Sequence, residues 1–79
     1  REVADALVSV EKTREARMHQ EALTKTLADQ QQLSWARYRG GVTAFLEVLD
    51  TQRQYFSAQQ ALSQAQRDEL LAVIALYEA

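Results

Sequence analysis

The chain has 79 residues, of which 47% are apolar and 25% are charged, and its net charge is −2. It has no cysteine, which excludes a disulfide scaffold and a cysteine-based zinc or thiol site. The mixed charges offer no basic face for nucleic acid, no apolar run approaches the roughly 18 residues of a membrane span, and Arg1-Glu2-Val3-Ala4-Asp5 is not expected to be a signal peptide.

The first arm is expected to be one helix over about residues 2–39. Residues 1–39 contain no glycine or proline, and the whole chain has 13 alanines and 10 glutamines but no asparagine. Arg37 and Arg39 are cations in the last turn, where the helix dipole favours them. The apolar stripe of this arm is interrupted, since Val3, Leu7 and Val10 are followed by Arg14, Arg17 and Glu21 and then by Leu23, Leu27, Trp35 and Tyr38.

The two glycines of the chain, Gly40 and Gly41, lie side by side near its midpoint. Glycine takes a positive φ at little cost, so the pair suits a helix C-cap followed by a tight turn. We expect this turn at about residues 40–42. With so short a connection the two arms must run antiparallel.

The second arm is expected to be a helix over about residues 43–78, with Thr43 as its N-cap and with Glu47 and Asp50 in its first two turns. One stripe at near-heptad spacing holds Phe45, Leu49, Phe56, Leu70 and Tyr77, with Val48, Tyr55, Leu62 and Leu76 beside it. Another holds Ala58, Ala61, Ala65, Ala72 and Ala75. Small residues of this kind let helices approach closely.

The predicted fold is therefore all-α: a single antiparallel two-helix hairpin over residues 1–79. Such a hairpin has little interior, and burial barely offsets an ordering cost of about 1.5 kcal/mol per residue. Glutamines 30–32 and 59–60 also occupy helix positions where a two-stranded core would favour leucine. The broad stripes then suggest more than one helical neighbour for each helix, so we expect a piece of a larger helical assembly.

The stretch ARYRGGVTAFLEVLDTQR, residues 36–53, resembles the signature of TolC-like outer-membrane efflux proteins. The following YFSAQQAL and the closing AVIALYEA are similar to the last helix of that family. The likeness is greatest to the lipoprotein branch that serves resistance-nodulation-division pumps. It covers nearly the whole chain, although residues 1–34 match in character rather than by motif.

The resemblance implies a homotrimer in which each protomer contributes two hairpins to a periplasmic α-barrel below an outer-membrane β-barrel. This chain would be the lower part of the second hairpin, with its turn at the periplasmic tip and without membrane contact of its own. The implied partners are a periplasmic adaptor protein and, indirectly, an inner-membrane pump. The implied function is export of drugs or other solutes from a Gram-negative cell.

The resemblance also assigns residues. Adaptor docking would fall to the tip, namely Arg39, Gly40, Gly41, Val42 and Thr43. The constriction of the channel mouth would involve Tyr38, Leu46, Glu47, Asp50 and Arg53, with Leu46 in an apolar ring and with Tyr38, Asp50 and Arg53 in a polar network. From spacing alone, Asp50 lies four residues after Leu46 and so shares its helix face.

No nucleophile–base pair, phosphate loop or metal cluster stands out, so we expect no enzyme activity, cofactor or metal. His19 is interpreted as solvated, and Trp35 as packed between the helices rather than as a docking anchor. The alternative function is a structural coiled-coil hairpin or an adaptor-type binding module without a channel role.

Overall fold

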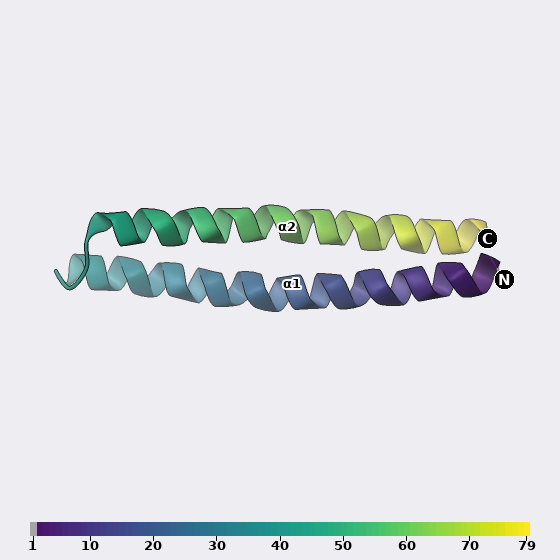
Figure 1. Cartoon of the computed structure of the whole chain (residues 1–79), viewed down its shortest axis with the longest axis horizontal. Helices are drawn as coiled ribbons and strands as arrows, with labels where there is room; N and C mark the ends of the chain where they lie inside the picture. The colour runs from purple at the N-terminus through teal and green to yellow at the C-terminus, as the bar shows by residue number, and fades with distance from the viewer. Residues whose placement is uncertain (1) are drawn as a thin grey trace.

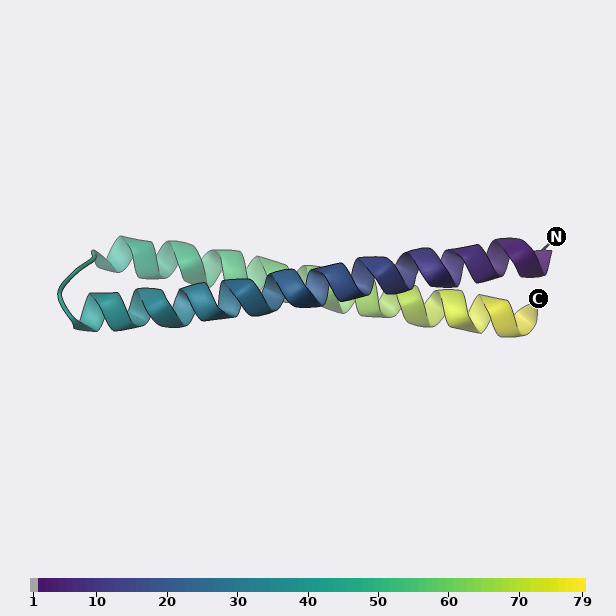
Figure 2. The ribbon, with the colours of Figure 1, turned by 90° about the horizontal axis from the view of Figure 1, so that it is seen from below.

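The computed structural model describes residues 2–79 as two long helices joined by a short turn. Helix α1 spans Glu2–Arg39 and α2 spans Phe45–Glu78. The helices run antiparallel, side by side, and wind about one another, with both ends of the chain at the same end of the molecule (Figures 1 and 2). The molecule measures 60 × 14 × 12 Å. The predicted all-α hairpin is confirmed.

The two helices meet along a seam whose residues are spaced alternately three and four apart, as in a coiled coil. On α1 the buried or half-buried residues of this seam are Ala6, Val10, Thr13, Arg17, Gln20, Thr24, Leu27, Gln31 and Ser34. On α2 they are Val48, Thr51, Tyr55, Ala58, Leu62, Ala65, Glu69, Ala72 and Leu76. Each helix therefore keeps one heptad face toward the other over almost its whole length.

This seam is made mostly of small and polar side chains. Among the described residues, the buried apolar ones are Val10, Val48, Ala58 and Ala72, and the buried polar ones are Thr24 and Ser34. Of the predicted alanine stripe, Ala58, Ala65 and Ala72 face α1, whereas Ala61 and Ala75 are exposed. A free-standing two-stranded coiled coil would concentrate large apolar residues at these positions, so the seam does not fit that alternative.

Four large apolar side chains of α2 instead lie exposed on another row at heptad spacing, which we call the outer stripe. It consists of Leu49, Phe56, Leu70 and Tyr77, and the last three are 62%, 60% and 88% exposed. A long apolar row in water usually marks an interaction surface. The hairpin thus leaves uncovered a face suited to a further helix, as the expected larger assembly requires.

Within residues 2–79, neither helix contains a stretch that is long and apolar enough to cross a membrane.

The turn between the helices is a Schellman motif centred on Gly41. The N–H of Val42 donates to the carbonyl of Arg37 at 2.9 Å, and the N–H of Gly41 donates to that of Tyr38 at 3.0 Å. Gly41 has a φ of 76°, in the left-handed region that glycine adopts most readily. The predicted role of the glycine pair as a C-cap is confirmed, with Gly41 as the residue that requires it.

The prediction that Thr43 caps α2 was wrong, and the helix begins two residues later than expected. Its N-cap is Ala44, with φ −81° and ψ 155°, and no side chain caps the helix there. The Thr43 hydroxyl donates to the carboxylate of Glu47 instead. The chain needs residues 42–44 to cross from α1 to α2, which leaves Thr43 one position too early to reach the free amides of the first turn.

Candidate functional site

The turn forms the far end of the molecule, opposite the two termini (Figure 1). Arg39, Gly40, Gly41 and Val42 are exposed there, and Thr43 is half-buried. Val42 is 70% exposed although it is apolar. The tip therefore presents bare backbone and one apolar side chain, with a cation from the last turn of α1 beside them.

Three aromatic rings connect the end of α1 to the start of α2 beside this tip. The Trp35 ring lies 6.2 Å from that of Tyr38 and 6.0 Å from that of Phe45, both edge to face, and the rings of Tyr38 and Phe45 are 5.2 Å apart. Such pairs contribute about 0.5–1.5 kcal/mol each beyond simple burial. The expectation that Trp35 packs between the helices is confirmed.

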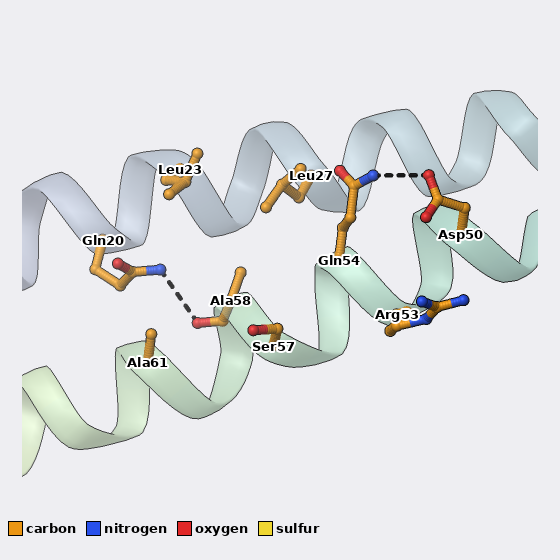
Figure 3. A pocket seen from close by; sticks show the side chains of 9 residues that line it. All are labelled: Gln20, Leu23, Leu27, Asp50, Arg53, Gln54, Ser57, Ala58 and Ala61. Atoms are coloured by element: carbon orange, nitrogen blue, oxygen red, sulfur yellow. Dashed lines mark hydrogen bonds between the residues drawn. The ribbon is translucent and has the colours of Figure 1, made fainter.

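The residues expected at the channel mouth lie on the first three turns of α2. Leu46, Glu47, Asp50 and Arg53 are all exposed. Because they lie on one unbroken helix, Leu46, Asp50 and Arg53 share a face, as the spacing predicted. Asp50 accepts a hydrogen bond of 2.9 Å from Gln54 Nε2 (Figure 3).

Tyr38 is not brought together with Asp50 and Arg53 inside this hairpin. Tyr38 packs on Phe45, and Phe45 and Asp50 are five residues apart, which is about 140° around a helix of 3.6 residues per turn. Within residues 2–79 no ion pair joins Asp50 to Arg53. A polar network of all three groups would need side chains from a neighbouring hairpin.

A shallow groove of about 560 Å³ runs between the helices next to Asp50 and Arg53 (Figure 3). Both helices line it with a mixture of apolar and polar side chains: Gln20, Leu23, Leu27, Asp50, Arg53, Gln54, Ser57, Ala58 and Ala61. It is open to solvent along the hairpin and holds no convergent catalytic set.

One feature that the sequence reading missed is a charged cluster across the seam, far from the tip. Arg17 Nε donates to Glu69 Oε1 at 2.6 Å, Arg17 Nη1 donates to Glu21 Oε1 at 2.7 Å, and Arg14 Nε lies 3.7 Å from Glu69 Oε2. Hydrogen bonding to Glu69, and then to Glu21, raises the pKa of Arg17 above its ordinary value. The only sequence signal was the interruption of the apolar stripe of α1 at these charges.

A second polar contact lies one heptad nearer the tip. Thr24 Oγ1 and Gln20 Nε2 donate to the backbone carbonyl of Ala58 at 3.2 and 3.3 Å. The small Ala58 side chain lets α1 come close enough for both bonds. Ser34, nearer still to the tip, is 2% exposed and its hydroxyl has no hydrogen-bond partner.

Over residues 2–79 no group of three or more histidine, cysteine, aspartate or glutamate side chains is placed to hold a metal ion. His19 is exposed on α1, which agrees with its interpretation as a solvated residue.

Comparison with known proteins points in one direction. Residues 1–79 match the family model of the outer membrane efflux protein. The chain is 37% identical over 78 residues to the probable efflux pump outer membrane protein TtgC of Pseudomonas putida, an alignment that covers 99% of this chain and 16% of that protein. It is 37% identical over 79 residues to the solvent efflux pump outer membrane protein SrpC of the same species, covering 100% of this chain and 17% of SrpC.

A further relative, the pyoverdine export outer membrane protein OpmQ of P. putida, is 46% identical over 48 residues, which are 61% of this chain and 10% of OpmQ. The chain thus spans about a sixth of the length of the curated relatives that it matches along its whole length. None of these relatives is named as an enzyme, which agrees with the expectation from the sequence that the chain has no enzyme activity. No solved structure matches the chain.

Proposed function

Because the chain belongs to the outer membrane efflux protein family, we propose that it is a wall segment of an efflux channel, at the periplasmic end of that channel. The observation that carries the proposal is the outer stripe. A hairpin that buries small residues in its own seam and exposes Phe56, Leu70 and Tyr77 is built to pack against further helices. The full-length protein is then a homotrimer whose hairpins close into a tube.

The proposed activity is export of drugs or other solutes across the outer membrane of a Gram-negative cell. The names of TtgC, SrpC and OpmQ, which refer to efflux, solvents and pyoverdine, support export of small organic solutes. The hairpin lies in the periplasm in this proposal, and solutes reach it from an inner-membrane pump through an adaptor.

The tip is the proposed docking site for the periplasmic adaptor protein. The Schellman bonds hold residues 37–42 in one conformation, so the tip loses little entropy when a partner binds. Val42 offers an apolar contact, and Gly40 and Gly41 let a partner helix approach the backbone closely. Arg39 and Thr43 supply polar groups at the edge of this surface.

Docking is tested by the binding of an adaptor to the full-length protein with Val42→Asp, which places a charge in the apolar contact. We expect affinity to fall at least tenfold, whereas Gln60→Asp, exposed and about four turns along α2, should bind like the parent protein. Gly41→Arg is less informative, because the positive φ of Gly41 would strain the turn itself. Equal affinities for Val42→Asp and Gln60→Asp would remove the tip from the docking surface.

The first turns of α2 are the proposed constriction. Leu46 is 76% exposed and would form an apolar ring when repeated about a threefold axis. Glu47 and Asp50 would add rings of negative charge, whose mutual repulsion and attraction for cations suit a gate. Tyr38 and Arg53 would hold the closed mouth together by contacts between neighbouring hairpins, because they do not meet Asp50 within one hairpin.

Gating is tested by replacing Asp50 and Arg53 together with alanine in the full-length channel. Ion conductance in planar bilayers should rise several-fold, since the contacts that keep the mouth closed are lost. Arg67→Ala is the matched control, because Arg67 lies on the same row of α2 two heptads farther from the tip. Unchanged conductance in the double variant would rule out the gate while leaving the family and the wall segment intact.

A further inference from the structure

Helix α2 offers α1 two different faces at heptad spacing, and α1 pairs with only one of them. The outer stripe presents Leu49, Phe56, Leu70 and Tyr77, whereas the seam of α2 alternates larger residues with threonine and alanine and contains Glu69. Because both faces carry large apolar side chains, apolar burial alone, at about 25 cal/mol for each Å² covered, does not choose between them. Some other contact must direct α1 to the seam.

The ion pair between Arg17 and Glu69 can form through only one of these two faces, the seam. Both side chains belong to the seam and are mostly shielded, with 25% and 19% of their surfaces exposed. Glu69 is the acidic residue of the α2 seam, and it takes both a direct bond from Arg17 and the nearby charge of Arg14. The pair therefore holds Arg17 only while the seam faces α1.

The outer stripe has no charge to replace Glu69. The residues at three- and four-residue spacing along that face are Phe45, Leu49, Gln52, Phe56, Gln59, Ser63, Gln66, Leu70, Val73 and Tyr77. If α2 turned about its axis to present them, Arg17 would face Gln66 and Leu70. Arg17 would then keep only the bond to Glu21 of its own helix, and the direct bond across the seam to Glu69 would be lost.

The hydrogen bonds to the backbone carbonyl of Ala58 likewise depend on which face of α2 meets α1. Thr24 and Gln20 reach the Ala58 carbonyl because the side chain there is a single methyl group. On the other face Phe56 and Gln59 would take its place, and their longer side chains would cover the backbone and separate the two donors from the Ala58 carbonyl. These two bonds are therefore made only while the seam faces α1.

We propose that these polar contacts of the seam, with the Arg17–Glu69 pair as the main one, select which face of α2 pairs with α1 and so keep the outer stripe free for a neighbouring helix. They act on the choice of partner face rather than on the overall stability of the pair, as buried polar groups do in other helical assemblies. The proposal needs only the hairpin and the outer stripe, and it is independent of the solute and the adaptor.

Cysteine cross-linking in the full-length protein distinguishes the two faces. Val10 and Ala72 are both buried, and counting in heptad steps from the Thr24–Ala58 contact places them in the same layer of the seam. A Val10→Cys/Ala72→Cys pair therefore reports pairing through the seam, and Val10→Cys/Leu70→Cys reports pairing through the outer stripe. Residues 1–79 contribute no cysteine of their own.

The variants compared are Glu69→Leu and Asp68→Leu. Asp68 is the adjacent acidic residue, but its carboxylate accepts a bond from Gln64 of its own helix and is exposed. The ratio of seam to outer-stripe cross-links should fall at least threefold in Glu69→Leu, fall further when Thr24→Val is added, and stay at the parent value in Asp68→Leu. Where Glu69→Leu fails to accumulate, Glu69→Gln takes its place and the same threefold fall is expected.

A fall of less than threefold, or an equal fall in Asp68→Leu, would overturn the proposal and leave the turn and side-chain size as the determinants of pairing.

Discussion

Of the two glycines, the turn requires Gly41 but not Gly40. A Cβ added to Gly41 would meet no atom within 4 Å, so the obstacle there is the φ of 76° and not space. A Cβ on Gly40 would lie 3.4 Å from the Ala36 carbonyl oxygen, close to ordinary contact, and φ is not positive there. The two adjacent glycines therefore differ: Gly41 provides the left-handed backbone of the turn, whereas the backbone of Gly40 accommodates a side chain.

We predict that Gly41→Ala destabilises the hairpin by about 1–2 kcal/mol, the cost of a left-handed conformation for a residue with a side chain. Gly41→Asn should cost less, because asparagine tolerates this region. Gly40→Ala should be neutral or stabilise by up to about 1 kcal/mol, because it reduces the freedom of the unfolded chain. Urea unfolding followed by circular dichroism, with every 79-residue variant at the same chain concentration, measures all three, and equal effects at both positions would contradict the assignment.

At the scale of the helix, the start of α2 is a weak point. Ala44 has the extended backbone of an N-cap but no side-chain oxygen for the free amides of the first turn. Thr43 has the oxygen but stands one residue too early, and it bonds to Glu47. The first turn of α2 therefore depends on the aromatic contacts of Phe45 and on the negative charge of Glu47 near its N-terminus.

We predict that Ala44→Ser raises the free energy of unfolding by about 1 kcal/mol, the usual difference between serine and alanine at an N-cap. Thr43→Ala should change it by less than about 0.5 kcal/mol, since an exposed contact is lost but no cap. The helicity of a peptide covering residues 42–79 is a direct measure of both. A larger loss from Thr43→Ala than the gain from Ala44→Ser would mean that Thr43 caps the helix after all.

The helices and the turn could be predicted from the sequence because the signals are local: no glycine or proline in either arm, and two glycines between them. The partner face of α2 could not, because α2 carries two rows at heptad spacing and periodicity does not say which one meets α1. The Arg17–Glu69 pair could not be predicted from the sequence for the same reason. It joins residues 52 apart, and its geometry follows only once the antiparallel register is known.

Of the candidate site, the common face of Leu46, Asp50 and Arg53 followed from the helix spacing, whereas the place of Arg39 and Val42 at the tip came from the resemblance. The separation of Tyr38 from Asp50 did not, since it depends on how Phe45 enters the aromatic cluster.

At the scale of the whole molecule, the hairpin is incomplete by itself. We predict that the isolated 79-residue chain associates in solution through the outer stripe, because its large side chains gain burial only by contact with another molecule. Phe56→Ser with Leu70→Ser should lower the average mass measured by sedimentation toward that of the monomer. Leu23→Ser with Leu33→Ser, two exposed leucines of α1, should not, and an equal effect of both pairs would mean that association is nonspecific.

The central claim is that this hairpin is part of a helical wall whose outer stripe is covered in the assembled protein. The most direct measurement is the rate at which a charged maleimide labels single cysteines in the full-length protein, comparing Phe56→Cys with Gln54→Cys and Leu70→Cys with Asp68→Cys. The wall predicts at least tenfold slower labelling at Phe56 and Leu70 than at their polar neighbours, and equal rates once the protein is unfolded. Equal rates in the native full-length protein would show an uncovered stripe and contradict the account.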